Sequence, residues 1–364
     1  MTWIKKYADL LSNYSLFLKE GELVYLRTTC LAQDLVRDFS QSCIDRSVNL
    51  VVEFDYEEKE EYLIANGNNN LLNYLPSSSI DLIQKCDAYL YIRAPYIPNA
   101  SISIDPQKEK IRSQALMKFQ EIYFERLGNG TLKRSLCQFP TLHAANLAGM
   151  SLGEYENFIV KACYLDKDDP EAYWKDLSKF QQTKVDYLNK TSQIVYEHTN
   201  WRIMFEVKGR TWINSDGKSN MPSGEVFTSP IENSVQGEIY FNYTSTVLGS
   251  MVQGIHLKVK DGYIQEYHAE TGQEVLDRVF EIEGSRYFGE VAIGTNMNIQ
   301  RATNNILFDE KIGGSIHMAV GQSYYQCGGK NKSSIHWDLI TDMKQGGRIY
   351  ADEKIIYENG VFII

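Results

Sequence analysis

The chain has 364 residues, 43% of them hydrophobic, and a formal net charge of −10 at pH 7. This length suits two domains, and the absence of a basic cluster argues against nucleic acid as a partner. No run of about 18 apolar residues and no basic-then-apolar leader occur. We therefore expect no membrane span and a cytoplasmic location.

The first half of the chain alternates strand and helix patterns, which predicts an α/β domain with a mostly parallel sheet and helices on its faces. The strand at 48–54 is apolar enough to be buried on both faces. A capping box at Ser151–Glu154 opens one of the helices. No glycine-rich phosphate-binding fingerprint accompanies the pattern, so no nucleotide site is expected. The other expected strands are 22–27, 87–93 and 134–139, and a long helix is expected over about 105–127.

The pattern changes to strands and turns near residue 200, after a helical stretch over 171–187. Asp261-Gly262 and Asn359-Gly360 are strong hairpin signals. One helix interrupts the strands, and Thr271-Gly-Gln-Glu274 is its expected capping box. We place an α/β domain at 1–199 and a β-rich α+β domain, which carries the candidate site, at 200–364.

His336 and Asp338 stand in the apolar segment Ile335-His-Trp-Asp-Leu-Ile340, which predicts a strand. Residues i and i+2 share one face of a strand, so both side chains point the same way, as two ligands of one metal would. The pair alone is weak evidence, since a His–Asp hydrogen bond in a β-domain explains it equally well.

His317 lies in a glycine-flanked apolar segment, where a lone histidine is usually a core residue. The preceding Asp309 and Glu310 change that interpretation. They place two carboxylates among apolar neighbours, where an unpaired charge is expensive. Metal coordination is one way to offset that cost.

Glu225 and Glu290 show the same conflict. Pro222 and Gly224 form a turn that delivers Glu225 into an apolar strand, and Glu290 follows a glycine within the apolar segment 288–294. Each alone is more often a salt-bridged or edge glutamate. All of these acids and histidines within one β-domain favour a metal site.

The charges of the candidate ligands indicate two ions. Glu225, Glu290 and Asp338 supply three negative charges, and a bridging hydroxide makes four, which balances two divalent cations. His317 and His336 are neutral ligands. Imidazole with carboxylate suits zinc, cobalt or manganese.

Six cysteines occur, and none forms a Cys-x-x-Cys pair. Five lie among apolar neighbours, which suits buried free thiols rather than a disulfide framework. Cys327 is the exception, because it lies close to the candidate ligands, and a direct chemical role is left open for it.

Several ordered motifs resemble those of the metal-dependent aminopeptidase family that includes aminopeptidase T, aminopeptidase S and PepS. The resemblance covers nearly the whole chain, and the motifs together are far more specific than any one of them. They lie at 212–214, 221–228, 289–296, 307–314, 316–321 and 334–339, with two more at 139–141 and 148–155.

The resemblance implies an enzyme that releases N-terminal residues from short peptides. It also implies that the β-rich domain holds the metals and that the protein is a homodimer with active sites facing an enclosed cavity. A tyrosine binds a metal only if the cation lowers its pKa from about 10, so chemistry alone would leave Tyr324 as a packed aromatic. By motif position, the implied ligands are Glu225, Glu290, His317, Tyr324, His336 and Asp338.

This enzyme would use one metal to polarise the scissile carbonyl and a bridging hydroxide to attack it. Glu310 would carry the proton to the leaving amine, and a carboxylate near the metals would hold the free α-ammonium. The segment from Asp309-Glu310 to His317 is two residues longer than in some family members, so Glu310 stays open between base, ligand and ammonium contact. Glu310 and Tyr324 are the candidate catalytic residues.

Two other classes of protein compete with the aminopeptidase. Some ring-cleaving dioxygenases of hydroxypyridines resemble distant relatives of this fold, and one carboxylate with His317, His336 and Asp338 could hold a single iron(II). That site leaves Glu225 or Glu290 without a purpose. A non-catalytic module that binds peptide or metal is the third class, and the complete ligand set argues against it.

Overall fold

The computed structural model describes residues 1–364, which form two compact units. Unit 1 comprises Met1–Glu171 and Gly217–Met221, and unit 2 comprises Ala172–Asp216 and Pro222–Ile364. This division differs from the sequence-based boundary at 199/200, because Val185 of the long helix before that boundary packs into the core of unit 2. No helix is both long and apolar enough to cross a membrane.

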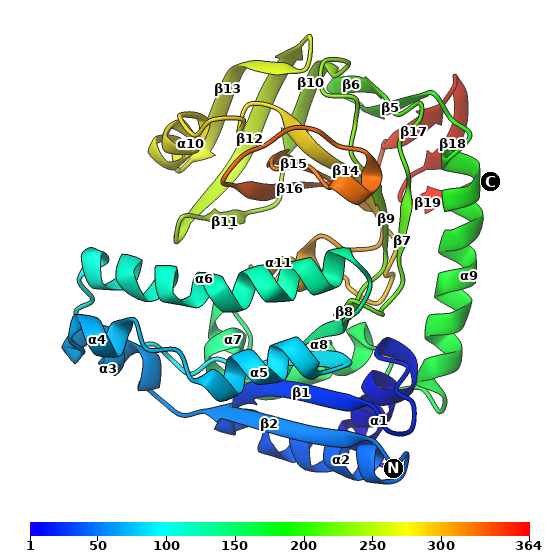
Figure 1. Ribbon diagram of the computed structural model, residues 1–364. Helices are drawn as coiled ribbons and strands as arrows, with labels where there is room; N and C mark the ends of the chain where they lie inside the picture. The colour runs from blue at the N-terminus through cyan, green and yellow to red at the C-terminus, as the bar shows by residue number, and fades with distance from the viewer. The chain divides into compact units, whose positions relative to one another are not determined.

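Unit 1 is built on a five-stranded sheet in the order β2-β1-β3-β4-β8, and every neighbouring pair in it is parallel. Helices α2 and α5 lie on opposite sides of this sheet (Figure 1). The predicted parallel sheet with helices is confirmed. The strands are β1 (Leu23–Thr29), β2 (Asn49–Asp55), β3 (Ala88–Arg93), β4 (Lys133–Gln138) and β8 (Asn220–Met221). The helices are α1 (Trp3–Leu10), η1 (Leu11–Ser15), η2 (Cys30–Ala32), α2 (Gln33–Ile44), α3 (Lys59–Asn66), α4 (Asn69–Leu72), α5 (Ser77–Lys85), α6 (Pro106–Gly128), α7 (Leu142–Leu147) and α8 (Leu152–Ala162).

Two local predictions are wrong. Strand β2 is not buried on both faces, because it is an edge strand with β1 as its one neighbour, and its Val51 and Phe54 are exposed. The capping box at Thr271 does not form, since Thr271 still belongs to a strand and the next helix begins after Gly272 in a left-handed conformation. The capping box of Ser151 and Glu154 is confirmed at the start of α8.

Unit 2 contains a nine-stranded sheet in the order β11-β12-β10-β6-β5-β17-β18-β19, with β13 paired to β12. Asp261-Gly262 joins the antiparallel strands β12 and β13, and Asn359-Gly360 joins β18 and β19, so both predicted hairpins are confirmed. The strands are β5 (Gln193–His198), β6 (Trp201–Glu206), β10 (Gln236–Phe241), β11 (Ser245–Val247), β12 (Ser250–Lys260), β13 (Tyr263–Thr271), β17 (Arg348–Ala351), β18 (Lys354–Glu358) and β19 (Val361–Phe362).

A second, five-stranded sheet of unit 2 has the order β16-β15-β14-β9-β7, and all of its neighbouring strands are antiparallel. The helices of unit 2 are α9 (Pro170–Leu188), α10 (Gln273–Phe280), α11 (Ile306–Asp309) and η3 (Tyr325–Cys327). The strands of this sheet are β7 (Ile213–Ser215), β9 (Glu225–Thr228), β14 (Phe288–Gly294), β15 (Ser315–Gly321) and β16 (His336–Asp342).

In each strand of the five-stranded sheet, successive side chains point to opposite faces of the sheet. Val226, Ile293 and Met318 are typical of the residues that enter the large core of unit 2. The residues between them include acids and histidines, yet β9, β14 and β15 are buried along their whole length. The second face of this sheet therefore carries acids and histidines that are mostly buried, and it holds the candidate site.

Candidate metal centre

The five predicted ligands that are acids or histidines come from four neighbouring strands of this sheet. Ala319 of β15 pairs with Glu290 of β14 on one side and with Asp338 of β16 on the other. Its methyl group is small enough to leave room between the two carboxylates. The other three ligands are Glu225 of β9, His317 of β15 and His336 of β16.

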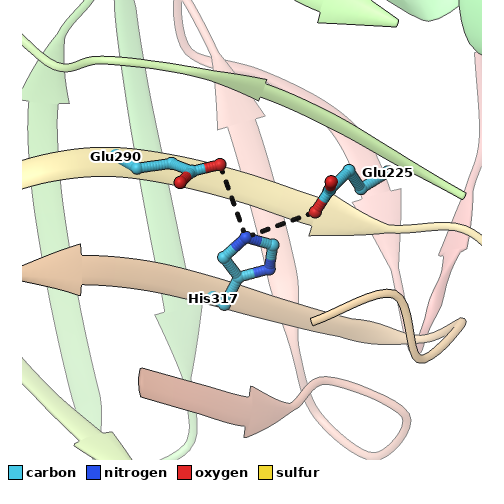
Figure 2. A group of neighbouring side chains, drawn as sticks. All are labelled: Glu225, Glu290 and His317. Atoms are coloured by element: carbon cyan, nitrogen blue, oxygen red, sulfur yellow. Dashed lines mark ion pairs between the residues drawn. The ribbon is translucent and has the colours of Figure 1, made fainter. Parts of the chain in front are cut away.

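A first group of candidate ligands is formed by Glu225, Glu290 and His317, which Figure 2 shows converging from three strands. The Nε2 atom of His317 lies 3.4 Å from Oε2 of Glu225 and 3.6 Å from Oε1 of Glu290. All three side chains are buried.

A second group is formed by Glu290, His336 and Asp338. The Nε2 atom of His336 lies 3.0 Å from Oε2 of Glu290 and 3.5 Å from Oδ1 of Asp338. His336 and Asp338 thus share one face of β16, which confirms the prediction made from their spacing. Glu290 presents one oxygen to each group, so it is the carboxylate that joins them.

The spacing around His317 fits a metal better than it fits hydrogen bonds, whereas the 3.0 Å between His336 and Glu290 is also a hydrogen-bond distance. Two atoms bound to one tetrahedral ion at about 2.0–2.1 Å are about 3.3 Å apart, and the His317 contacts measure 3.4 and 3.6 Å. Oε2 of Glu225, Oδ1 of Asp338 and both ring nitrogens of His317 are buried without a hydrogen-bond partner. Buried polar atoms rarely lack partners, so the donor set fits divalent cations.

The electrostatics of the metal-free cluster indicate a shortage of positive charge. Burial raises the pKa of Asp338, but His336, His317 and Lys311 together lower it to about 2. Burial lowers the pKa of His336, while Asp338 and Glu290 raise it to about 11. Burial also opposes the shifts at Glu290 and His317, yet the net pKa of Glu290 is lowered by the two histidines and that of His317 is raised by the carboxylates.

Glu310 follows α11 and is grouped with His317 and Asp338 as a third possible set of ligands. Its carboxylate also forms an ion pair with the neighbouring Lys311. Asp309 lies apart from these groups, because its side chain accepts hydrogen bonds of 2.8 Å from the backbone and the hydroxyl of Thr303. Burial raises the pKa of Asp309 to about 6.

Lys311 is the residue of the site that the sequence reasoning missed. Its side chain has no exposed surface, and its Nζ lies 3.3 Å from Oε1 of Glu225. The signal was present, since a charged residue stands in the apolar, glycine-flanked run from Leu307 to Gly314. That conflict identified the acids, and it applied equally to the lysine.

Tyr324 lies beside the second group. Its ring centroid is 5.0 Å from that of His336 and 5.4 Å from that of Phe227, and its backbone N–H donates to Oγ of Ser229. The side chain is 38% exposed, unlike the buried acids. Its coordination of a metal stays a prediction.

Cys327 is buried against Phe227 and Ala292, and burial raises the pKa of its thiol to about 12. A thiolate, the form that binds metals and attacks carbonyls, is therefore disfavoured there. All six cysteines are free, and Cys30 is exposed, so the expectation that it is buried is wrong.

The similarity of this chain to known metalloproteases agrees with a metal site in this position. A family model described as thermophilic metalloprotease (M29) matches residues 2–362. Aminopeptidase 2 of Geobacillus stearothermophilus is 25% identical over 364 aligned residues, which cover 88% of this chain and 84% of that protein.

Two solved structures share the fold over the whole chain. Wild-type AmpT from Thermus thermophilus matches with a TM-score of 0.85 at 20% identity, covering 100% of this chain and 99% of that one. A 2,5-dihydroxypyridine dioxygenase from Pseudomonas putida KT2440 matches with a TM-score of 0.62 at 13% identity, covering 100% and 98%. At these identities both likenesses describe the fold alone.

Proposed function

The chain belongs to the M29 family of thermophilic metalloproteases. We propose that it is an aminopeptidase that releases N-terminal residues from short peptides. The predicted family and the predicted class, a metal-dependent hydrolase, are confirmed by a match that spans residues 2–362. The aminopeptidase activity is supported by the similarity to Aminopeptidase 2 over most of both chains.

The observation that carries this proposal is the shared Glu290, with one oxygen toward His317 and the other toward His336. We propose that Glu225, Glu290 and His317 hold one ion. Glu290, His336 and Asp338 hold the second, and Tyr324 joins that set from its position beside His336. Zinc, cobalt and manganese suit these ligands.

When bound, such ions would lower the pKa of a water molecule and polarise the scissile carbonyl. Hydrolysis adds the water oxygen to the carbonyl carbon and breaks the C–N bond. We propose that Glu310 takes the proton from the water and passes it to the leaving nitrogen, which its proximity to His317 and Asp338 supports. The restriction to the N-terminal residue is supported by the similarity to Aminopeptidase 2 rather than by charge, because Lys311 offsets the additional carboxylate.

A single-iron dioxygenase is the competing function on this fold. It would use one carboxylate with His317, His336 and Asp338 and leave Glu225 or Glu290 as a buried carboxylate with no metal to offset its charge. That cost is the reason why we propose the hydrolase. The homodimer and the cytoplasmic location stay predictions drawn from the family resemblance and the sequence pattern.

An assay of matched substrates tests the proposal. The metal-loaded protein is given aminoacyl chromogenic substrates and the same substrates with an acetylated amine, and we expect turnover of the free amines only. Glu225→Ala should remove turnover, whereas Glu238→Gln, which changes an acid on the nine-stranded sheet, should not. Unchanged turnover of Glu225→Ala with full metal content would contradict the assignment.

A further inference from the structure

Lys311 is a fixed cation inside the cluster of acids. Its backbone carbonyl accepts a hydrogen bond of 3.1 Å from the N–H of Asn296, and its own N–H donates to the carbonyl of Phe308 at 3.0 Å. The side chain is fully buried, and its ammonium pairs with Glu225 and Glu310. A buried ammonium without carboxylates would carry a large desolvation cost, so this pairing is not easily given up.

Lys311 forms an ion pair with a member of the first ligand group only. The ammonium group of Lys311 pairs with Oε1 of Glu225, and Oε2 of the same carboxylate faces His317 in the first group. An ion held by Glu225 would therefore share that carboxylate with a positive charge, and the two cations repel each other. Lys311 forms its ion pairs with Glu225 and Glu310, and its charge lowers the pKa of Asp338 less than either histidine does.

The two histidines also differ in whether their Nδ1 atom has a hydrogen-bond partner. Nδ1 of His336 lies 2.8 Å from the carbonyl of Gln322, so it can donate there and leave Nε2 free to bind a metal. Nδ1 of His317 is buried without a hydrogen-bond partner. A partner on the second nitrogen orients a ligating histidine and makes it a better ligand, and its loss costs about 10–100-fold in metal affinity.

We propose that Lys311 makes the two metal positions unequal: the ion at Glu290, His336 and Asp338 binds first and tightly, and the ion at Glu225, Glu290 and His317 binds second and weakly. The inference rests on the two-ion arrangement of the proposed function. It deepens that arrangement, because the weak position then decides at what free metal concentration the site is complete.

Titration of the metal-free protein with Co²⁺, followed by visible absorption and by calorimetry, tests this inference. The wild type should show two binding phases that differ by about 10–100-fold in affinity. Lys311→Met should tighten the weak phase by about tenfold or more, since the repelling charge is gone. The tight phase should change much less.

Three further variants identify the phases. His317→Ala should abolish the weak binding phase and keep the tight one. His336→Ala should abolish the tight binding phase and keep the weak one. Lys258→Met, which removes the exposed pair with Glu266, is the matched control and should change neither phase. The His317→Ala and His336→Ala measurements keep Lys311, so they decide the order of binding even if Lys311→Met fails to fold.

Two ions of equal affinity in the wild type would overturn the inference while leaving the proposed function intact if peptides are still cleaved. An unchanged weak phase in folded Lys311→Met, or loss of the tight phase in His317→Ala, would overturn it as well. Binding of one ion per chain at saturation would instead contradict the two-ion proposal itself, so the two failures are distinguishable.

Discussion

Two sheets of this protein carry charged residues on one face, and they treat those charges differently. In the parallel sheet of unit 1, Nη2 of Arg27 lies 3.4 Å from Glu53 and 3.7 Å from Asp55, and Lys59 also pairs with Asp55. Two acids meet two cations there, and Arg27 keeps 29% of its side chain exposed. The charges are balanced within the protein.

The five-stranded sheet of unit 2 lacks that balance. Glu225, Glu290 and Asp338 are buried, and Lys311 is the one lysine or arginine that forms an ion pair with any of them. The comparison teaches that a charged sheet face is not by itself a functional sign. An excess of buried acid over cation is such a sign, because protein interiors tolerate it only with a metal or bound protons.

The largest expected effect comes from Glu290, because both ligand groups depend on it. Glu290→Gln should lower kcat/KM by about 1,000-fold or more, as the loss of several kcal/mol of metal-assisted stabilisation implies. Steady-state kinetics with metal analysis would check this. Near-normal turnover with two ions bound would show that Glu290 does not join two positions.

Metal removal should destabilise unit 2 in particular. Ligands that bind the folded state alone contribute about 4 kcal/mol at 1,000 times their dissociation constant. Thermal unfolding with and without a chelator should therefore show a clearly lower Tm for the metal-free protein. An equal Tm in both states would mean that the acid excess is not compensated by metal.

The pH dependence of the metal-free protein follows from the His336–Asp338 pair. The folded pKa of His336 is raised to about 11, so its contribution to stability is complete below its unfolded pKa of about 6.5 and is lost as the pH rises toward 11. Asp338, lowered to about 2, contributes above its unfolded pKa of about 3.9 and loses that contribution as the pH falls.

His336→Ala should therefore destabilise the metal-free protein more at pH 6 than at pH 9.5. Urea unfolding of the wild type and the variant at both values of pH would measure the difference. A cost that is equal at the two values, or greater at pH 9.5, contradicts the assigned direction.

The smallest effect should come from the balanced face in unit 1. Arg27→Met removes two partly exposed ion pairs, each of a kind that contributes about 0.2–1 kcal/mol to stability. We expect a correspondingly small shift in the free energy of unfolding and unchanged metal content. Loss of metal in this variant would remove the distinction between the two sheets.

The sequence predicted those parts of the structure that depend on local patterns. His336 and Asp338 share a face because they are two residues apart in a strand, and Glu225 and Glu290 were identifiable because each charge interrupts an apolar run. The hairpin at Asp261-Gly262 followed from its turn residues.

The features that the sequence analysis missed depend on tertiary context. Whether the apolar strand β2 is central or at the edge is decided by the order of strands in the sheet, which its own residues do not encode. Lys311 interrupts the same apolar run as Asp309 and Glu310, so the sequence marked its position but not its partners. Its complete burial arises only when the loop after α11 folds against the strand that carries Glu225.

Anomalous diffraction from crystals equilibrated with excess zinc, cobalt or manganese would show directly whether two metal ions share Glu290. We expect two peaks that flank the carboxylate of Glu290, one toward His317 and one toward His336. A single peak beside His336 and Asp338, or none at Glu290, would contradict the two-metal site.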